Sequence, residues 1–303
     1  MIFLRFKNFV RDKLNIQKGT RLFAVLDRIY RFINNCTRVK GPLGTLPDFL
    51  ILGVQKSGTT SIFDWLIQHP NIYSSTKKDI HYFDCNYTHK LSWYRSFFPL
   101  RFSRWFVNRI LKQPFLTGEA STSYSFYHFR TAKRIKRMNP NMKLIMVVRN
   151  PIERTYSLYK HLIENGREKR TFENAIDQEE KTIGDEQEKV QRYPNYVGFN
   201  HYYFSYKLRG RYYDQLKSFM DLFPNEQIKV ISFEDFFSDP QQGCNELFDF
   251  LEVPRHRLKR YSKLNISKTK KRMKPETRKK LKDYFNKENE KLFKLIGKRF
   301  DWE

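Results

Sequence analysis

A short polar loop, Gln55–Thr60, combines a cation, a glycine and three hydroxyl side chains. Backbone N–H groups, hydroxyls and an ammonium group are donors with which proteins bind phosphate. The ammonium of Lys56 can offset negative charge, and Gly58 lets the backbone approach an anion closely. We therefore predict an anion-binding loop whose candidate ligands are Lys56, Ser57, Gly58, Thr59 and Thr60.

The loop nearly matches the Walker A motif of ATP- and GTP-binding proteins. Gly53 and Gly58 have the glycine spacing of that motif, but Thr59 follows where the motif has lysine. The lysine stands earlier in this chain, at Lys56. This shift argues against an ordinary ATP or GTP site.

A second candidate anion site lies further along the chain, at Arg149 and Ser157. The planar guanidinium of arginine suits a bidentate contact with phosphate. Pro151, with Asn150 before it as a cap, predicts the start of a helix. Arg149 would then stand at the end of a strand, and Ser157 would lie two turns into the following helix.

Apolar and amphipathic segments predict the elements that position these residues. The apolar runs Phe49–Val54, Lys143–Arg149 and Gln227–Ser232 predict buried strands, and the pattern at Ser61–Gln68 predicts a helix. A strand, a tight loop and a helix together point backbone N–H groups and a helix dipole at a phosphate. The alternation of strands and helices predicts an α/β fold with a parallel sheet.

The two anion sites, in this order, resemble those of the sulfotransferases that use 3′-phosphoadenylyl sulfate (PAPS) as sulfuryl donor. The loop Gln55–Thr60 is similar to the family's 5′-phosphosulfate loop, and Arg149 with Ser157 is similar to its 3′-phosphate element. Lys77–Asp84 and Gly118–Tyr124 resemble segments of the heparan-sulfate-type and related prokaryotic members.

The resemblance covers residues 47–303 and implies a single P-loop-like α/β domain with a central, mainly parallel sheet flanked by helices. Residues 1–46 would form a basic N-terminal extension. The implied reaction is in-line transfer of a sulfuryl group from PAPS to a hydroxyl or amine of a carbohydrate or related acceptor, without a metal. A late basic loop matches the position of the family's loop over PAPS, and its candidate donor contacts are Lys270 and Arg272.

The resemblance leaves two candidates for the base that removes the acceptor's proton. Asp79 matches the position where glycan-modifying members usually carry glutamate, and a carboxylate near a hydroxyl can accept its proton. His81 is the rival, because the ordinary pKa of histidine is near neutral. If this segment is extended, both side chains point to the same side. The predicted catalytic residues are therefore Lys56 with Asp79 or His81.

One departure from the heparan-sulfate-type members concerns the acceptor. Ala120 stands where some of them have lysine, just after Glu119. This difference argues against heparan sulfate as the acceptor, and against the 3-O-sulfating subtype especially. Ser121 and Tyr124 are candidates to line the acceptor cleft, although a packing role suits Tyr124 equally well.

The chain is strongly basic, with a net charge of +26. Such a charge favours anionic partners, and we expect PAPS, its product adenosine 3′,5′-bisphosphate (PAP), and a glycan or glycolipid acceptor. Nucleic acid is not expected, because none of the standard nucleic-acid-binding signatures is present. Two alternatives stay open: a P-loop nucleotide kinase, and a non-enzymatic protein that binds polyanions or nucleic acid.

The cysteines and the lengths of the apolar segments indicate the cellular location of the protein. Three cysteines lie far apart, so neither a disulfide framework nor a metal-ligand spacing is indicated. The apolar runs are too short to span a bilayer, and charges interrupt the apolar start of the chain. We predict a cytoplasmic enzyme, with peripheral membrane contact through the basic N-terminus as an open alternative.

Overall fold

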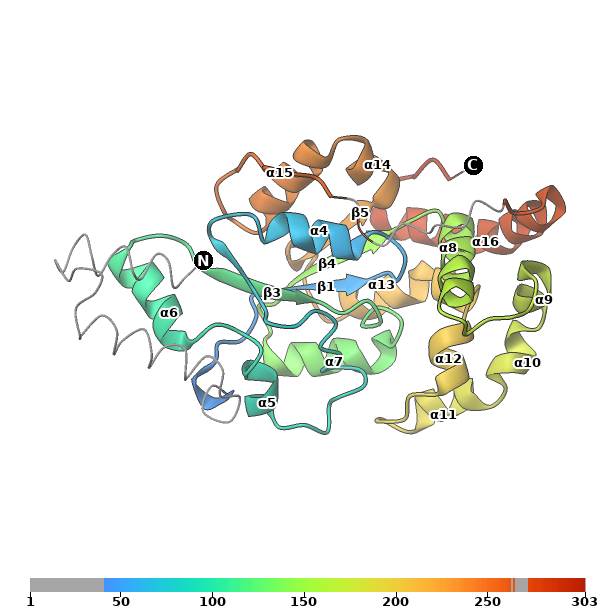
Figure 1. The fold of residues 1–303 in the computed structure, drawn as a ribbon, viewed down its shortest axis with the longest axis horizontal. Coiled ribbons are helices and arrows are strands. Elements are labelled where there is room, and N and C mark those ends of the chain that lie inside the picture. Colours follow the sequence, from blue (N-terminus) through green and yellow to red (C-terminus); the bar gives the residue numbers. More distant parts are fainter. Residues whose placement is uncertain (1–40, 263, 265–271, 303) are drawn as a thin grey trace.

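The computed structural model describes residues 41–262, residue 264 and residues 272–302. At its centre is a five-stranded sheet with the order β2-β3-β1-β4-β5, in which every pair of neighbours is parallel (Figure 1). The strands are β1 (Phe49–Gly53), β2 (Ile72–Ser74), β3 (Leu116–Ala120), β4 (Lys143–Val148) and β5 (Ile228–Ser232). The predicted single α/β domain with a parallel sheet is confirmed.

Two strands were not predicted, and both lack a strong local signal. β2 has three residues, and β3 carries Gly118 and Glu119, which are poor strand formers. The prediction of a loop over Gly118–Tyr124 is therefore wrong for its first three residues, which end β3. Tertiary packing requires the glycine, because a Cβ on Gly118 would lie 2.5 Å from the ring of Phe49.

Helices cover both faces of the sheet. Figure 1 shows α4, α14 and α15 on one side and α7 and α13 on the other. The longer helices are α4 (Thr59–Leu66), α7 (His128–Met138), α8 (Pro151–Glu164), α13 (Tyr212–Met220), α15 (Pro240–Phe250) and α16 (Pro275–Ile296). The shorter ones are α5 (Leu91–Arg95), α6 (Arg101–Trp105), α9 (Phe172–Asp177), α10 (Glu179–Ile183), α11 (Glu186–Arg192), α12 (Phe199–Phe204) and α14 (Phe233–Ser238). Short turns of other helix types are η1 (Phe106–Ile110), η2 (Leu208–Gly210) and η3 (Asn225–Gln227).

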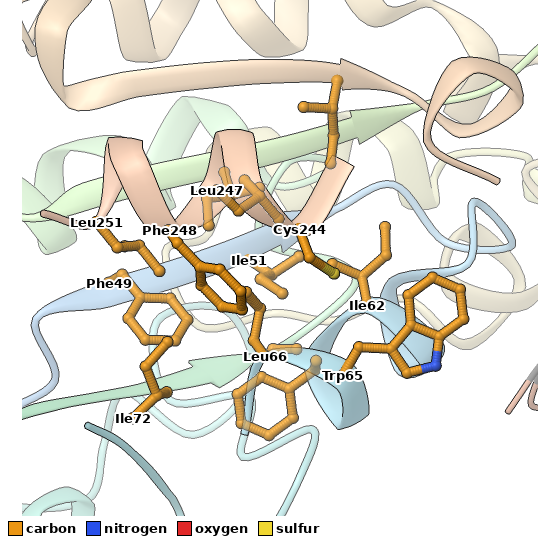
Figure 2. Close-up of a cluster of buried hydrophobic side chains, with 14 of the residues drawn as sticks. Phe49, Ile51, Ile62, Trp65, Leu66, Ile72, Cys244, Leu247, Phe248 and Leu251 are labelled. Carbon is orange, nitrogen blue, oxygen red and sulfur yellow. The ribbon is translucent and has the colours of Figure 1, made fainter. Parts of the chain in front are cut away.

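The hydrophobic core is divided between the two faces of β1, because successive strand residues point to opposite sides. Phe49 and Ile51 pack on α4 and α15, and Figure 2 shows Phe49 beside Leu251 and Ile51 beside Phe248. Leu50 and its neighbours on that face pack on α7 and α13. Burial of each such side chain contributes about 1.5–3 kcal/mol, so β1 is held firmly beneath the loop that follows it.

Local signals set these helix ends, and the predicted start of α8 is confirmed. Asn150 caps α8 by accepting a hydrogen bond from the backbone N–H of Ile152 at 3.0 Å, and Pro151 is the first helical residue. Gly297 ends α16 with a φ of 65°.

No helix of the described residues is long and apolar enough to cross a membrane. Two of the three cysteines, Cys85 and Cys244, are described and both are free. Residues 1–40, on which the membrane-contact prediction rests, lie outside the described part. Residues 44–46 contact the domain, since Gly44 pairs with Leu100 and the N–H of Thr45 donates to the carbonyl of Pro99 at 2.8 Å. The domain boundary at residue 46 stays a prediction.

Candidate active site

A cavity of about 550 Å³ lies where the carboxyl ends of the adjacent strands β1 and β4 meet the loops that follow them. Parallel strands place such loops side by side, and α/β proteins bind ligands at this edge of the sheet. The wall is formed by the loop after β1, the segment around Lys78, one side of α8, and α14, with Thr122 and Leu264 completing it. The structure thus brings together the two anion sites predicted from distant parts of the chain.

The loop after β1 leads into α4, and the N-terminus of this helix lies at the cavity. Gly58 is the residue before the helix, and no side chain caps the first turn. Free backbone N–H groups and the helix dipole are therefore available to an anion. Gly58 has a φ of 75°, and a Cβ there would lie 2.6 Å from the ring of Phe237. The close approach of Phe237 and the backbone conformation both require glycine.

The other loop residues that were predicted to bind an anion do not all line the cavity. Lys56, Thr59 and Thr60 line the cavity, whereas Ser57 is buried and its hydroxyl has no hydrogen-bond partner among the described residues. Lys56 has a φ of 70°, which is uncommon for a residue with a Cβ. Backbone strain of this kind is often found at functional sites.

Cations dominate the cavity wall. Lys56, Lys78, Arg149 and Lys160 all line it. Burial lowers the pKa of Lys56; Glu164 opposes this change, while the three neighbouring cations add to it. Four cations that repel one another in a partly buried space favour the binding of an anion that neutralises them.

Arg149 is held in place before any ligand binds. One guanidinium Nη donates to the carbonyl of Lys56 at 3.0 Å, and the guanidinium carbon lies 4.4 Å from the ring centre of Phe233. The Nε of Arg149 has no hydrogen-bond partner among the described residues, and burial lowers the pKa of the Arg149 guanidinium. Ser157, on α8, lines the same cavity. These contacts leave Arg149 with unused donors beside the predicted phosphate site.

Lys78 connects the phosphate loop to the predicted base and was not among the predicted site residues. Its ammonium donates to the hydroxyl of Thr60 and lies 3.5 Å from Oδ2 of Asp79. Asp79 lines the cavity, and its Oδ1 has no hydrogen-bond partner among the described residues. The unpaired Oδ1 is buried, so its hydrogen-bonding capacity is unused in this structure, while the side chain as a whole is 39% exposed.

His81 lies away from the cavity lining, because this segment is not extended. Asp79 and His81 have φ values of 51° and 55°, in the left-handed region, so the extended conformation on which a shared side depended is not present. Asp79 lines the cavity and His81 does not. Nδ1 of His81 lies 3.0 Å from Oδ2 of Asp84 and 3.0 Å from the hydroxyl of Ser123. Burial alone would lower the pKa of His81, but the hydrogen bond and charge of Asp84 outweigh it and raise that pKa.

Glu119 and its neighbours form a buried polar group behind the cavity. The Glu119 carboxylate accepts hydrogen bonds of 2.7 Å from the phenols of Tyr94 and Tyr124, and burial raises its pKa to about 7. Ser121 is buried as well and its hydroxyl accepts from the backbone N–H of His81 at 3.0 Å. Ser121 and Tyr124 therefore belong to the core, and Thr122 is the member of this segment that lines the cavity.

His81, Asp84 and Cys85 are close enough to hold a metal ion, with ligand atoms within 4.8 Å of one another. Their chemistry favours the hydrogen-bonded form instead. Nδ1 of His81 is already bonded to Asp84, and burial together with Asp84 raises the pKa of the Cys85 thiol. The thiolate that a metal requires is therefore disfavoured.

The late basic loop is only partly described. Lys270 lies outside the described residues, and Arg272 is exposed and does not line the cavity. Leu264, which precedes this loop, does line it, and its backbone N–H donates to the hydroxyl of Ser61 at 2.8 Å. The donor-binding roles of Lys270 and Arg272 stay predictions.

Sequence reasoning also missed Lys160 and His161, which line the cavity from α8. They lie three and four residues after Ser157, the spacing that places side chains on one helix face. That spacing could have identified them once Ser157 was proposed.

Comparisons with known proteins agree with this arrangement. The sulfotransferase domain family model matches residues 46–303. The membrane-associated sulfotransferase kil1 of Dictyostelium discoideum is 28% identical over 89% of this chain and 69% of its own length. Heparan sulfate glucosamine 3-O-sulfotransferase 3B1 of Mus musculus is 26% identical over 85% of this chain and 65% of its own.

Among solved structures, a sulfotransferase from Alicyclobacillus acidocaldarius is 29% identical, with a TM-score of 0.65. The match covers 84% of this chain and 98% of that one. The chain spans about two thirds of the length of the two curated relatives, and nearly the whole of the bacterial enzyme. By its domain match and by the fold around this cavity, the chain belongs to the sulfotransferase family.

Proposed function

We propose that this protein transfers a sulfuryl group from PAPS to a hydroxyl or amine of a carbohydrate or related acceptor. The observation that carries the proposal is the single cavity lined by Lys56, Arg149, Ser157 and Asp79. It joins two anion-binding elements to one carboxylate. A donor with two separated phosphate groups and an acceptor that must lose a proton need this combination.

For the donor, Lys56 and the open N-terminus of α4 would hold the 5′-phosphosulfate. The ammonium offsets the negative charge that grows on the bridging oxygen as the sulfur–oxygen bond breaks. Arg149 and Ser157 would hold the 3′-phosphate, which distinguishes PAPS from ATP. The contact between Arg149 and the Lys56 carbonyl couples the two halves of this donor site at 3.0 Å.

For the acceptor, we assign the base to Asp79 rather than His81. The hydroxyl oxygen attacks sulfur, its proton passes to the Asp79 carboxylate, and PAP leaves with the bridging oxygen. Asp79 lines the cavity with one unpaired oxygen, whereas the imidazole of His81 is engaged by Asp84 and Ser123. His81 would position the segment that carries Asp79.

Lys78 is proposed as the residue that aligns the base with the donor. It contacts both Thr60 of the phosphate loop and Asp79, so it fixes the distance between them. An aspartate is one methylene shorter than the glutamate of related enzymes, and this fixed alignment would compensate for the shorter reach.

A glycan or glycolipid is the proposed acceptor. The relatives include enzymes named for the glucosamine of heparan sulfate. The cationic surroundings of the cavity suit an acidic or sulfated glycan. Ala120, in place of the lysine of some heparan-type enzymes, argues for a different glycan. The cytoplasmic location stays a prediction.

The test is calorimetric titration with PAP and with AMP, followed by an acceptor screen with radiolabelled PAPS. Binding of PAP that exceeds binding of AMP, together with label transfer to a glycan, is the expected result. Magnesium-dependent ATP turnover would instead favour the kinase alternative. Steeply salt-dependent DNA binding that PAP does not affect would favour the polyanion-binding alternative.

A further inference from the structure

Two large aromatic side chains stand on the outer side of α6, where a helix of a water-soluble domain normally carries polar residues. Phe102 is 57% exposed and Trp105 is 51% exposed, and their ring centres lie 5.6 Å apart. Ile110, at the end of η1, is 41% exposed. The inner side, with Phe106 and Val107, packs into the domain. Within the described residues, nothing buries these outward apolar side chains.

Cations surround these side chains. Residues 85–118 contain six Lys and Arg but no Asp or Glu. Arg104 is paired with Asp48 at 2.6 Å, but no ion pair within the described residues involves Arg101, Arg109 or Lys112. The pKa of Arg95 is lowered by burial and by the charge of Arg101, which shows how closely these cations lie. The surface therefore favours an anionic partner.

This surface lies at the end of the domain opposite the donor cavity. The segment from α6 through η1 leads into the amino end of β3, while Thr122, beyond the carboxyl end of β3, lines the cavity. Figure 1 shows α6 at one end of the described part of the molecule, beyond the amino ends of the strands. A partner bound to α6 would leave the entrance of the cavity free.

We propose that this surface docks the enzyme onto an anionic lipid bilayer; we name it the α6 surface and define it by Arg101, Phe102, Trp105, Arg109, Ile110 and Lys112. Tryptophan and phenylalanine are favoured at the membrane interface, and cations beside them are attracted to anionic headgroups. An anionic bilayer both attracts these cations and takes up apolar side chains.

Other partners fit less well. A soluble polyanion would neutralise Arg101 and Arg109, but it would leave Phe102 and Ile110 in water. Residues 1–40 of the same chain hold ten Lys and Arg against two Asp and Glu, so their charge repels this surface. A second copy of the chain would bring two such basic surfaces together.

The test is co-sedimentation of the full chain with vesicles of phosphatidylcholine, with and without phosphatidylserine. We expect binding only to the vesicles that contain phosphatidylserine. The double substitution Phe102→Ala and Trp105→Ala should weaken binding about tenfold or more, because two apolar side chains no longer enter the bilayer. The double substitution Arg101→Gln and Arg109→Gln should weaken it about fivefold per cation.

Phe199→Ala is the matched control, because Phe199 is 60% exposed on α12, far from this surface. It should bind vesicles like the wild type. Trp105 is the most exposed of the four tryptophans, so vesicles should shift the protein's fluorescence to shorter wavelength in the wild type and not in Trp105→Phe. Thermal unfolding and PAP titration of each variant check that the fold and the donor site are intact.

The proposal is overturned if the Phe102/Trp105 variant sediments like the wild type. Equal binding to vesicles without phosphatidylserine would also overturn it. So would a dimer that depends on these residues, or binding to heparin fragments without binding to vesicles. Failure of PAP binding in the wild type would count against the proposed reaction alone, since the α6 surface does not contribute to the donor site.

Discussion

Substitution of Arg149 by glutamine tests the assignment of the 3′-phosphate site. In the structure the guanidinium is preset by the Lys56 carbonyl at 3.0 Å and by the ring of Phe233 at 4.4 Å. Its Nε remains unpaired among the described residues. Glutamine keeps the first three side-chain carbons and a polar end, but it is shorter and removes the charge and the forked donors. The variant should therefore retain the fold and lose the contact with one phosphate group.

The expected loss follows from the type of contact. A hydrogen bond to a charged group contributes about 1.5–3 kcal/mol. With about 1.4 kcal/mol for each factor of ten, the Kd for PAP should rise about 10- to 150-fold. The substitution also removes the hydrogen bond to the Lys56 carbonyl, which destabilises the loop by about 0.5–1.5 kcal/mol. This destabilisation should weaken every ligand that binds the loop. Because AMP lacks the 3′-phosphate, its change in Kd measures the effect of the loop alone.

The assay is calorimetric titration of wild type and Arg149→Gln with PAP and with AMP. The informative quantity is the ratio of the two Kd values, because the effect on the loop cancels in it. We expect the substitution to reduce the preference for PAP about tenfold or more. An unchanged ratio would refute the 3′-phosphate assignment, even if both ligands bound more weakly.

Four further substitutions test the base, the phosphate loop and the buried carboxyl of Glu119. Asp79→Asn should lower kcat about 100-fold or more with little change in the Kd for PAP, whereas His81→Ala should lower kcat less. Equal and small losses of kcat in one transfer assay would exclude both residues as the base. Gly58→Ala should weaken PAP binding and lower the melting temperature. The φ of Gly58 is 75°, and an added Cβ would lie 2.6 Å from the ring of Phe237. A variant with unchanged PAP binding and melting temperature would contradict this loop geometry. Burial raises the pKa of Glu119 from 4.5 to about 7, so between these pH values the folded protein holds a proton that the unfolded chain has released. Stability should therefore fall as pH rises through this interval, by about 3 kcal/mol at most, and Glu119→Gln should remove this part of the pH dependence in denaturant titrations; identical pH profiles would show that Glu119 is ionised in the fold.

The phosphate loop and the strands around it were predictable because their signals are local. A continuous apolar run predicts a buried strand wherever it occurs, and Asn150 with Pro151 starts a helix through contacts within one turn. β2 and β3 escaped prediction for the opposite reason. Gly118 and Glu119 sit in a strand because Phe49 packs over the glycine and two phenols bind the carboxylate.

The geometry around the predicted base required the tertiary structure. The N–H of Asp79 donates to the carbonyl of Ala120 at 3.1 Å, and the N–H of His81 donates to the Ser121 hydroxyl at 3.0 Å. Both residues have positive φ, so the segment is not extended. Asp79 lines the cavity, whereas His81 bonds to Asp84 and Ser123.

Local patterns predicted a strand, a polar loop and a helix around Lys56, and a second strand that ends before Arg149. The tertiary structure was needed to place these loops at one cavity, to join Lys78 to both Thr60 and Asp79, and to bury Glu119. The physical reason is the sequence separation of the interacting residues. Strand and helix patterns arise from residues close together in the sequence, whereas the direction of a side chain depends on contacts with residues far away in the sequence.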